Sequence, residues 1–527
     1  MALLALALRL LPIGWGAGLR PHEGFYHPDE PKVFASTAGF PGNYLSNPIL
    51  IYGTAVQYGL GVVLLPAKVL WAWGLRPPPF EHYGHFVLLA ERGLHVLLGV
   101  LTLLVLYRLG LRLFDRRVAL LASALLAISP LHVLNSALAT LDVPAAFLAT
   151  LVLLLSLRAS FSERRRDFVW LGLAAGALLG TKIAAAVALV APLTLLVAGR
   201  SQHRLVGRWA LAGGIAAAVF LITTPALVVK TGDYLAFMSD QHATWVAARP
   251  HDLLSILAVQ AASLGTALGW PTALLGLAGL AAAVARSEAR DRLGHLALLA
   301  VLLAHVVFWR GYAPARFALL VVPMLCLYAA LSLVLLLTAG GVLRRAGLGA
   351  LALAFAFSAW ATAGGLRQRT GDDPRTLAAR EIVVVVPQGA TVALAAATES
   401  DPWTGHAWRY PRLPDGAYVF KALLDRPAYI VTTSYVLRRI APLVARPEGG
   451  VATQDEVRWF HGRVPSPPEL HFYRALLGGT AGYTLERSWK PAGVDPVEFA
   501  APEIRLYRRV GPEAAAVAGG AGAERPR

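Results

Sequence analysis

Residues 87–134 read VLLAERGLHVLLGVLTLLVLYRLG, then LRLFDRR, then VALLASALLAISPLHVL. The first and third parts are apolar and close to the length of about 20 residues that a membrane-spanning helix needs. The part between them is short and basic. Two apolar runs joined by a basic loop are typical of a helical hairpin in a membrane, with the loop in the cytoplasm.

The composition of the whole chain agrees with this interpretation. Of its 527 residues, 56% are hydrophobic and 15% are charged, against about 25% charged in soluble proteins. The mean hydropathy is +0.56. These values exclude a soluble globule and a disordered chain. The only cysteine, Cys326, lies in an apolar run, which excludes intrachain disulfides, CxxC zinc sites and iron–sulfur clusters.

The apolar pattern predicts a polytopic α-helical membrane protein with about eleven transmembrane helices. The predicted spans are 2–20, 87–110, 118–134, 143–158, 168–181, 183–199, 208–228, 253–284, 294–309, 317–338 and 345–365. The first span lacks a clean signal-peptide cleavage site, so we expect it to be retained. Gly269, Trp270 and Pro271 predict a break or a tilt in 253–284. Almost no loop separates 168–181 from 183–199, which predicts a tight hairpin.

The positions of the basic residues predict the orientation. One set of loops is rich in arginine: 108–117, 158–166, 200–208, 286–292 and 344–345. The positive-inside rule places these loops in the cytoplasm. With eleven spans, the amino terminus is then inside and the carboxyl terminus outside the plasma membrane. Much of the formal charge of +17 is explained by this pattern, so we expect no nucleic-acid partner.

Residues 21–86 form the predicted first external loop of a membrane domain that covers 1–365. Its apolar stretch 49–73 carries tyrosine, glutamine and tryptophan side chains. If this stretch crossed the membrane, every later basic loop would change sides. We therefore expect an amphipathic helix in the membrane interface.

The composition changes after residue 365, where prolines, charges and turn signals appear. We expect an extracytoplasmic α/β domain over 366–510. A helix is predicted at 375–386, and Asp372, Asp373 and Pro374 directly before it mark its start. Strands are predicted at 391–397, 429–433, 483–488 and 504–508, with a helix after Thr433. The Ala/Gly-rich tail 511–527 is predicted to be disordered.

The first candidate for chemistry is the segment Tyr26–Lys32, which contains His27 and the adjacent carboxylates Asp29 and Glu30. Charges near a membrane are costly unless they are used. Two adjacent carboxylates cannot point the same way from an extended segment, so one can face a cavity while the other caps a helix. The alternative is an acidic N-cap before Pro31, without a catalytic role.

Three more candidates lie at predicted external helix ends. Asp142 precedes Val143-Pro144, and its alternative is again an N-cap. Lys182 follows Gly180-Thr181, an arrangement that suits phosphate but lacks the glycine spacing of a Walker motif; its alternative is an interfacial lysine. Arg316 suits bidentate phosphate contact, or anchors a span at the interface.

Together these residues predict an acid beside several cations at one membrane depth. Transfer from a lipid-phosphate donor requires this combination, because a carboxylate takes the proton of an acceptor hydroxyl while cations stabilise the leaving phosphate. His242 and Trp245 fit either a substrate groove or an aromatic belt. Tyr26, His27, Asn47 and Tyr52 are further groove candidates. No HExxH motif or histidine cluster indicates a metal site.

The ordered motifs resemble those of a known group. These are Tyr26–Phe34, Tyr44–Tyr52, Arg108–Val118, Ser129–Pro144, Gly180–Lys182, Arg316–Pro323, Arg375–Ala378 and Pro502–Tyr507. Nearly the whole chain is similar to the GT-C class of polyprenyl-phosphate-sugar-dependent glycosyltransferases. Within it, the chain resembles bacterial family-39-like proteins, which are related to protein O-mannosyltransferases and to the aminoarabinose transferase of lipid A.

The resemblance implies roles for individual residues. Asp29 would be the base that activates the acceptor, and Glu30 would support its loop or bind a divalent ion. Lys32, Lys182 and Arg316 would contact the donor phosphate, and Asp142 would orient these cations or the sugar.

This chain departs from the pattern of the group in two places. Where aminoarabinose relatives have an acidic residue and a lysine, it has Ser46-Asn47-Pro48. This removes a phosphate ligand and a metal ligand, so the resemblance does not establish metal dependence. It also lacks the β-trefoil repeats of protein mannosyltransferases, so a protein acceptor is not implied.

The leading interpretation is an inverting transferase in the cell envelope, with a polyprenyl-phosphate-sugar donor and a lipid, glycan or protein acceptor. A lipid-linked-sugar flippase or transporter is the first alternative, and it would place charges in mid-span in two similar halves. A non-catalytic membrane assembly protein is the second, and loss of Asp29 would favour it. The sequence leaves the sugar, the acceptor and the lipid length open.

Overall fold

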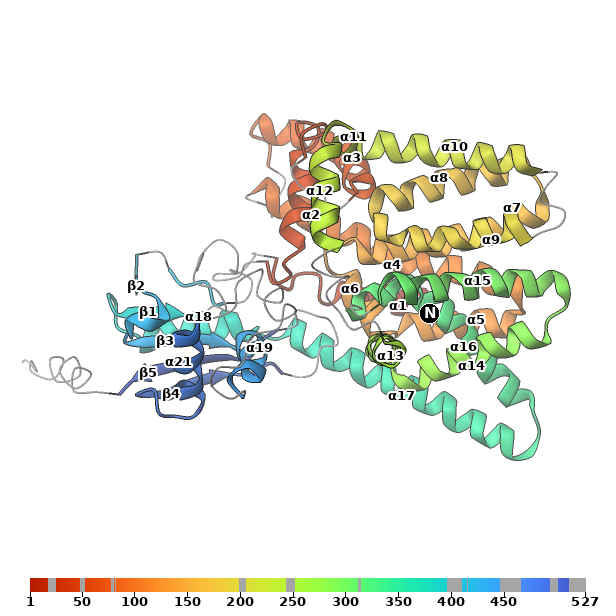
Figure 1. Ribbon diagram of the computed structural model, residues 1–527. Coiled ribbons are helices and arrows are strands. Elements are labelled where there is room, and N and C mark those ends of the chain that lie inside the picture. Colours follow the sequence, from red (N-terminus) through yellow and green to blue (C-terminus); the bar gives the residue numbers. More distant parts are fainter. Residues whose placement is uncertain are drawn as a thin grey trace, which may run out of the picture. The chain divides into compact units, whose positions relative to one another are not determined.

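The computed structural model describes residues 1–17, 25–47, 53–76, 80, 82–198, 205–242, 252–310, 314–395, 410–414, 416–445, 466–492 and 501–510. The described residues form two compact units. The helical unit contains the described residues of 1–15 and 28–367, and the sheet unit contains those of 16–27, 368–492 and 501–510. Figure 1 labels the helices and strands of both.

The first half of the helical unit runs from the amino terminus to residue 198. Its elements are α1 (Ala2–Leu10), α2 (Glu30–Gly39), α3 (Ala55–Ala72), α4 (Tyr83–Leu113), α5 (Arg116–Ala127), α6 (Pro130–Ser136), α7 (Asp142–Ser162), α8 (Arg165–Thr181), the 3₁₀ helix η1 (Ile183–Leu189) and α9 (Val190–Ala198).

The second half continues from residue 205. Its elements are α10 (Val206–Thr223), α11 (Pro225–Val229), α12 (Thr231–His242), α13 (Leu253–Leu268), α14 (Trp270–Arg286), α15 (Ala289–Phe308), the 3₁₀ helix η4 (Ala315–Leu320), α16 (Val322–Thr338) and α17 (Gly341–Thr370).

This unit confirms the prediction of a polytopic α-helical membrane protein. Among the described residues, six helices are long and apolar enough to cross a membrane, or up to eight if each of two bent pairs is one span. The predicted number of eleven is not confirmed. Four predicted spans correspond to helices α1, α8, α9 and α16, which are all shorter than 18 residues.

The predicted helix over 2–20 is wrong in length, because α1 ends at Leu10. Pro12 has no N–H to donate, and its ring would clash with the carbonyl four residues earlier in a continuing helix. The chain instead makes short turns, in which Ile13 N donates to Leu10 O and Trp15 N to Pro12 O.

Two predicted spans are broken. The helix axis bends by 112° between α13 and α14, which confirms the break predicted at Gly269-Trp270-Pro271. Gly269 has φ +81°, a conformation that glycine adopts without strain. The helix axis bends by 59° between α5 and α6, at Ser129-Pro130.

Helix α3 lies in the stretch for which the sequence predicts an interfacial position. Its 18 residues are also long and apolar enough to cross a membrane. Lys68, within this helix, donates to Ala38 O (2.8 Å) and Phe40 O (2.5 Å). The ammonium therefore satisfies carbonyls at the carboxyl end of α2.

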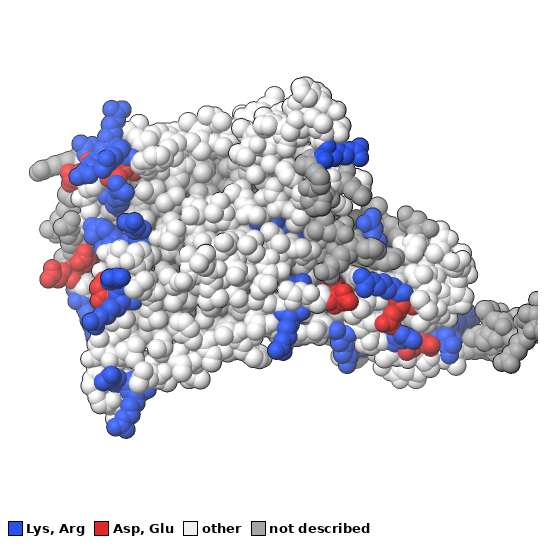
Figure 2. Space-filling view, turned by 180° about the vertical axis from the view of Figure 1, so that it is seen from behind, with Lys and Arg blue, Asp and Glu red and all other residues white. Residues whose placement is uncertain are grey.

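Basic residues gather at one end of the helical unit. Figure 2 shows Lys and Arg there, with a few Asp and Glu, while the long side of the unit is almost uncharged. The arginine-rich segments at the ends of helices are Arg108–Arg117, Arg158–Arg166, Arg286–Arg292 and Arg344–Arg345. This distribution is the one that the positive-inside rule describes.

Close helix packing fixes the end of α8, from which Lys182 extends. Gly172 and Gly176 lie against the backbone of α10, where a Cβ would come within 2.6 Å of Ala212 O and 2.5 Å of Ala216 O. At Gly53, a Cβ would lie 2.1 Å from Gly180 O. Small residues at this spacing let membrane helices approach each other closely, so the segment before Lys182 has little room to move.

The sheet unit contains α18 (Pro374–Val385), β1 (Thr391–Leu394), β2 (Val419–Phe420), the 3₁₀ helix η5 (Leu423–Asp425), β3 (Tyr429–Thr433), α19 (Ser434–Val444), α21 (Pro467–Leu477), β4 (Tyr483–Trp489) and β5 (Ile504–Arg509). The strand order is β2-β1-β3-β5-β4. Strands β1, β2 and β3 are parallel, while β5 is antiparallel to both β3 and β4.

These elements confirm the predicted α/β composition, including the helix that Asp373 caps by accepting from Arg375 N. The sequence interpretation missed β2 and α21.

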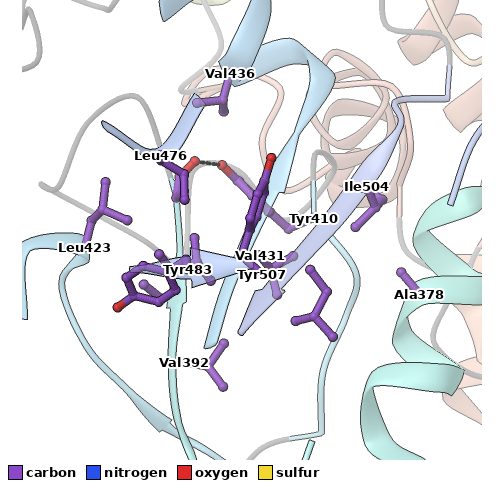
Figure 3. Close-up of a cluster of buried hydrophobic side chains, with 14 of the residues drawn as sticks. Ala378, Val392, Tyr410, Leu423, Val431, Val436, Leu476, Tyr483, Ile504 and Tyr507 are labelled. Carbon is purple, nitrogen blue, oxygen red and sulfur yellow. Dashed lines mark hydrogen bonds between the residues drawn. The ribbon is translucent and has the colours of Figure 1, made fainter. Parts of the chain in front are cut away.

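The core of the sheet unit lies between the strands and helices α18, α19 and α21. Figure 3 shows its apolar side chains, among them Val431, Ile504 and Leu476. Burial raises the pKa of Tyr483 to about 12, against the opposing charges of Arg509 and Arg426. Its hydroxyl donates to Pro427 O at 2.6 Å. The unit therefore has its own hydrophobic core.

Candidate active site

Asp29 is the residue at the amino-terminal cap of α2, but its side chain makes no capping hydrogen bond. Instead, Oδ2 lies 3.3 Å from a guanidinium nitrogen of Arg316, and Oδ1 lies 3.7 Å from Lys32 Nζ. The Asp29 side chain is 13% exposed. The N-cap alternative therefore accounts for the position of Asp29 in the helix, but not for the direction of its carboxylate, which faces two cations.

Asp142, the second acidic candidate, forms an ion pair with Lys182. Asp142 is the first residue of α7 and Leu141 is its cap, so the N-cap alternative for Asp142 is wrong. The Asp142 carboxylate accepts from Lys182 Nζ at 2.5 Å, and the two side chains are 6% and 11% exposed. Lys182 is thus a largely buried member of an ion pair, which contradicts its alternative as an interfacial lysine that extends freely to the membrane surface.

Phe317 joins the two ion pairs into one site. Its ring centroid lies 4.5 Å from Lys182 Nζ and 5.4 Å from the guanidinium carbon of Arg316. Two cations beside one aromatic ring gain cation–π attraction. The structure therefore brings together Asp29, Asp142 and all three predicted cations, from the ends of α2, α7, α8 and η4.

Glu30 has a different environment from its neighbour. Glu30 is fully buried, and its carboxylate accepts hydrogen bonds from Nε and Nη2 of Arg92, each at 2.8 Å. The carboxylate also accepts from the backbone N–H of Ala139 at 2.8 Å. Arg92 also donates to Ile13 O and Trp15 O. These bonds tie the segment before α2 to α4 and to the segment before α7. Glu30 is therefore placed to support the loop that carries Asp29.

The other predicted groove residues are distributed differently. Tyr26 and His27 are buried in the sheet unit, where the Tyr26 ring lies 3.9 Å from the guanidinium carbon of Arg375. Asn47 is buried and donates to Ser36 and Tyr58. Tyr52 lies outside the described residues. His242 ends α12, but its side chain is also outside them.

Sequence reasoning missed the charged pair Glu91-Arg92 inside the apolar run 87–110. Both side chains are fully buried, and Glu91 accepts from the Thr37 hydroxyl at 2.7 Å. Two adjacent charges within a predicted span are a signal in themselves, because such charges are costly in a membrane and are retained when paired. That signal could have identified the partner of Glu30.

The site combines two carboxylates with three cations, so its net formal charge is positive. Such an arrangement can bind an anionic group next to a partly exposed carboxylate. Among the described residues, no group of three or more His, Cys, Asp and Glu side chains could hold a metal ion.

Fold and site together define a class of protein: a multispanning membrane protein with the GT-C fold, whose acidic and basic residues meet at helix ends. The family model described as dolichyl-phosphate-mannose-protein mannosyltransferase matches residues 85–228. No curated protein shows significant sequence similarity to this chain. This family match agrees, over residues 85–228, with the resemblance expected from the motifs.

Several solved structures are similar to this chain. The oligosaccharyltransferase of Archaeoglobus fulgidus, tethered to an acceptor peptide, is 14% identical, with 94% of this chain and 72% of that chain covered and a TM-score of 0.52. Its apo form is 16% identical with a TM-score of 0.49, with coverage of 77% of this chain and 62% of that chain.

ArnT from Cupriavidus metallidurans, bound to undecaprenyl phosphate, is 15% identical with a TM-score of 0.48; the coverage is 91% of this chain and 93% of that chain. The similarity to the peptide-tethered oligosaccharyltransferase of Archaeoglobus fulgidus supports a shared fold for this chain and that enzyme.

Proposed function

We propose that this protein is a membrane glycosyltransferase that moves a sugar from a polyprenyl-phosphate-linked donor to an acceptor hydroxyl. The observation that carries this proposal is the direction of Asp29, which occupies a cap position without capping and faces Arg316 and Lys32. The description of the matched family, which names dolichyl-phosphate-mannose, supports the donor class.

The proposed reaction uses each part of the site. The acceptor oxygen attacks the anomeric carbon, and the carbon–oxygen bond to phosphate breaks with its electron pair leaving on the phosphate. Asp29 takes the acceptor proton. Lys182 and Arg316 stabilise the charge that develops on the phosphate, Lys32 adds a further cation, and Asp142 holds Lys182 in place. Attack from the face opposite the phosphate would invert the anomeric configuration.

The direct test is an assay of the purified chain with radiolabelled polyprenyl-phosphate sugars. We expect release of labelled sugar to water or to an added acceptor, together with binding of the lipid donor. Absence of both release and donor binding would contradict the proposal and favour a non-catalytic assembly role. Transport of an intact donor across vesicles without cleavage would favour a flippase.

We also propose that the site and the sheet unit are extracytoplasmic, since the arginine-rich helix ends carry the signal for the cytoplasmic side. The variant for this test carries Thr484→Cys, at an exposed position of the edge strand β4, in a Cys326→Ala background. We expect an impermeant thiol reagent to label it in intact cells. The matched control, Glu288→Cys before α15, should react only after permeabilisation; the reverse pattern would overturn the proposed orientation.

A further inference from the structure

His305 on α15 is a buried polar side chain that the proposed chemistry does not yet use. Its side chain is 1% exposed. Within the described part of the chain, neither ring nitrogen of His305 has a hydrogen-bond partner. Leaving buried polar groups unpaired is costly, and nearly all such groups in folded proteins have a partner. The absence of a hydrogen-bond partner for the buried imidazole of His305 therefore calls for a physical explanation.

The surroundings of His305 connect it to the candidate active site. Helix α15, which carries His305, packs against η1, the 3₁₀ helix that begins directly after Lys182. Trp309, the residue at the carboxyl-terminal cap of α15, follows His305 by one helical turn. Its ring packs against Phe317 in a tilted arrangement, with ring centroids 4.1 Å apart. The Trp309 indole nitrogen is likewise buried with no hydrogen-bond partner in the described part of the chain. In the described part of the chain, His305 and Trp309 thus carry unpaired ring nitrogens one helical turn apart, and Trp309 lies beside the ring that contacts Lys182.

His295, a second buried histidine on α15, has the hydrogen-bond partner and ring contact that are typical of a structural histidine. His295 is also 1% exposed, but its Nδ1 lies 3.0 Å from the Tyr328 hydroxyl and its ring stacks on Phe114. The buried His95 and His132 likewise each have a partner, at Leu138 O and at Arg9. His305 therefore differs from these histidines in its lack of a partner.

The missing partner of His305 is best explained by a ligand. A ligand that accepts hydrogen bonds would satisfy the imidazole and indole N–H groups. Because Phe317, the ring packed against Trp309, also lies beside the ammonium of Lys182, an anionic acceptor suits the position better than a neutral hydroxyl does.

We propose that His305, with the Trp309 indole, donates hydrogen bonds to the phosphate group of the polyprenyl-phosphate donor beside Lys182. This inference rests on the proposed function and adds two contacts to the phosphate that no sequence motif indicated.

The test compares His305→Leu and His305→Gln with the wild-type full-length chain. The probe is a polyprenyl phosphate without a sugar. We expect His305→Leu to weaken its binding by about tenfold to a hundredfold, the size of one hydrogen bond to a charged group. His305→Gln, which keeps an N–H donor, should recover part of the affinity. The ligand-free His305→Leu protein should unfold at the same or a higher temperature, since an unpaired buried polar group has been removed.

The matched control is His295→Leu, which should show the opposite pattern: a lower unfolding temperature and unchanged lipid binding. A polyprenol without phosphate separates contact with the phosphate from contact with the lipid tail, and its binding should not depend on His305. Unchanged phosphate-lipid binding in folded His305→Leu would overturn the inference, as would an equal loss of polyprenol binding. If the wild-type chain binds no polyprenyl phosphate, the proposed function itself fails.

Discussion

Replacing Asp29 by asparagine is expected to reduce sugar transfer by about 10²–10⁴-fold, the usual contribution of a general base. Asparagine keeps the size of the side chain but cannot take the acceptor proton. Binding of the donor should be largely retained, because Lys182 and Arg316 remain. The measurement is the turnover of a radiolabelled polyprenyl-phosphate sugar, with donor binding determined on the same samples.

The matched control for this variant is Asp252→Asn. Asp252 is also the cap residue of a helix, α13, but its carboxylate accepts from Ser255 N at 2.8 Å. Asparagine caps helices as well as aspartate does, so turnover should be unchanged. Near-normal turnover in Asp29→Asn would contradict its assignment as the base.

Glu30→Gln is expected to act on stability. The substitution leaves the Arg92 guanidinium, which is 0% exposed, without its carboxylate. Removing one partner of a buried pair typically costs about 3–5 kcal/mol, because a buried charge is left uncompensated. We therefore expect a clear fall in the thermal unfolding midpoint of the purified protein.

The double variant Glu30→Gln/Arg92→Leu serves as the control, since it removes both charges. It should recover part of the lost stability. A Glu30→Gln protein of normal stability that has lost turnover would show instead that Glu30 takes part in the reaction, and our structural assignment would be wrong.

The sequence predicted the sheet unit well because its signals are local. Asp373 before Pro374 marks the start of α18. A run of β-branched and aromatic residues marks β3, and apolar residues alternate with arginine at the start of β5. Strand β2 was missed because it has only two residues, Val419 and Phe420. A segment that short has no periodicity to detect.

The number of membrane spans was harder to predict. Apolar runs of similar composition became continuous helices such as α7, bent pairs such as α13 and α14, or short helices such as α16. Hydropathy measures the cost of exposing a segment to water. It does not report whether the helix bends, or how much of it is covered by its neighbours; α16, for example, is buried along most of its length.

The sequence also named Asp29, Lys32, Asp142, Lys182 and Arg316 as candidates, and the structure brings them together. The resemblance assigned the role of base to Asp29, but the residues by themselves could not say which of two adjacent carboxylates faces the cations. That depends on Arg92 in α4, which takes Glu30 into the interior, and on Arg316, which lies beside Asp29. Both partners are far from the Asp29-Glu30 pair in the sequence.

By itself, the sequence determined the class of this protein: a polytopic helical membrane protein with a separate α/β unit and charged residues at helix ends. Apolar length, charge position and turn residues are properties of short segments, so they can be read in order along the chain. Only the tertiary structure decided the direction of Asp29, the burial of Glu30 and the isolation of His305. Each of these depends on which side chains from distant segments meet in space, and therefore on which polar groups find a partner.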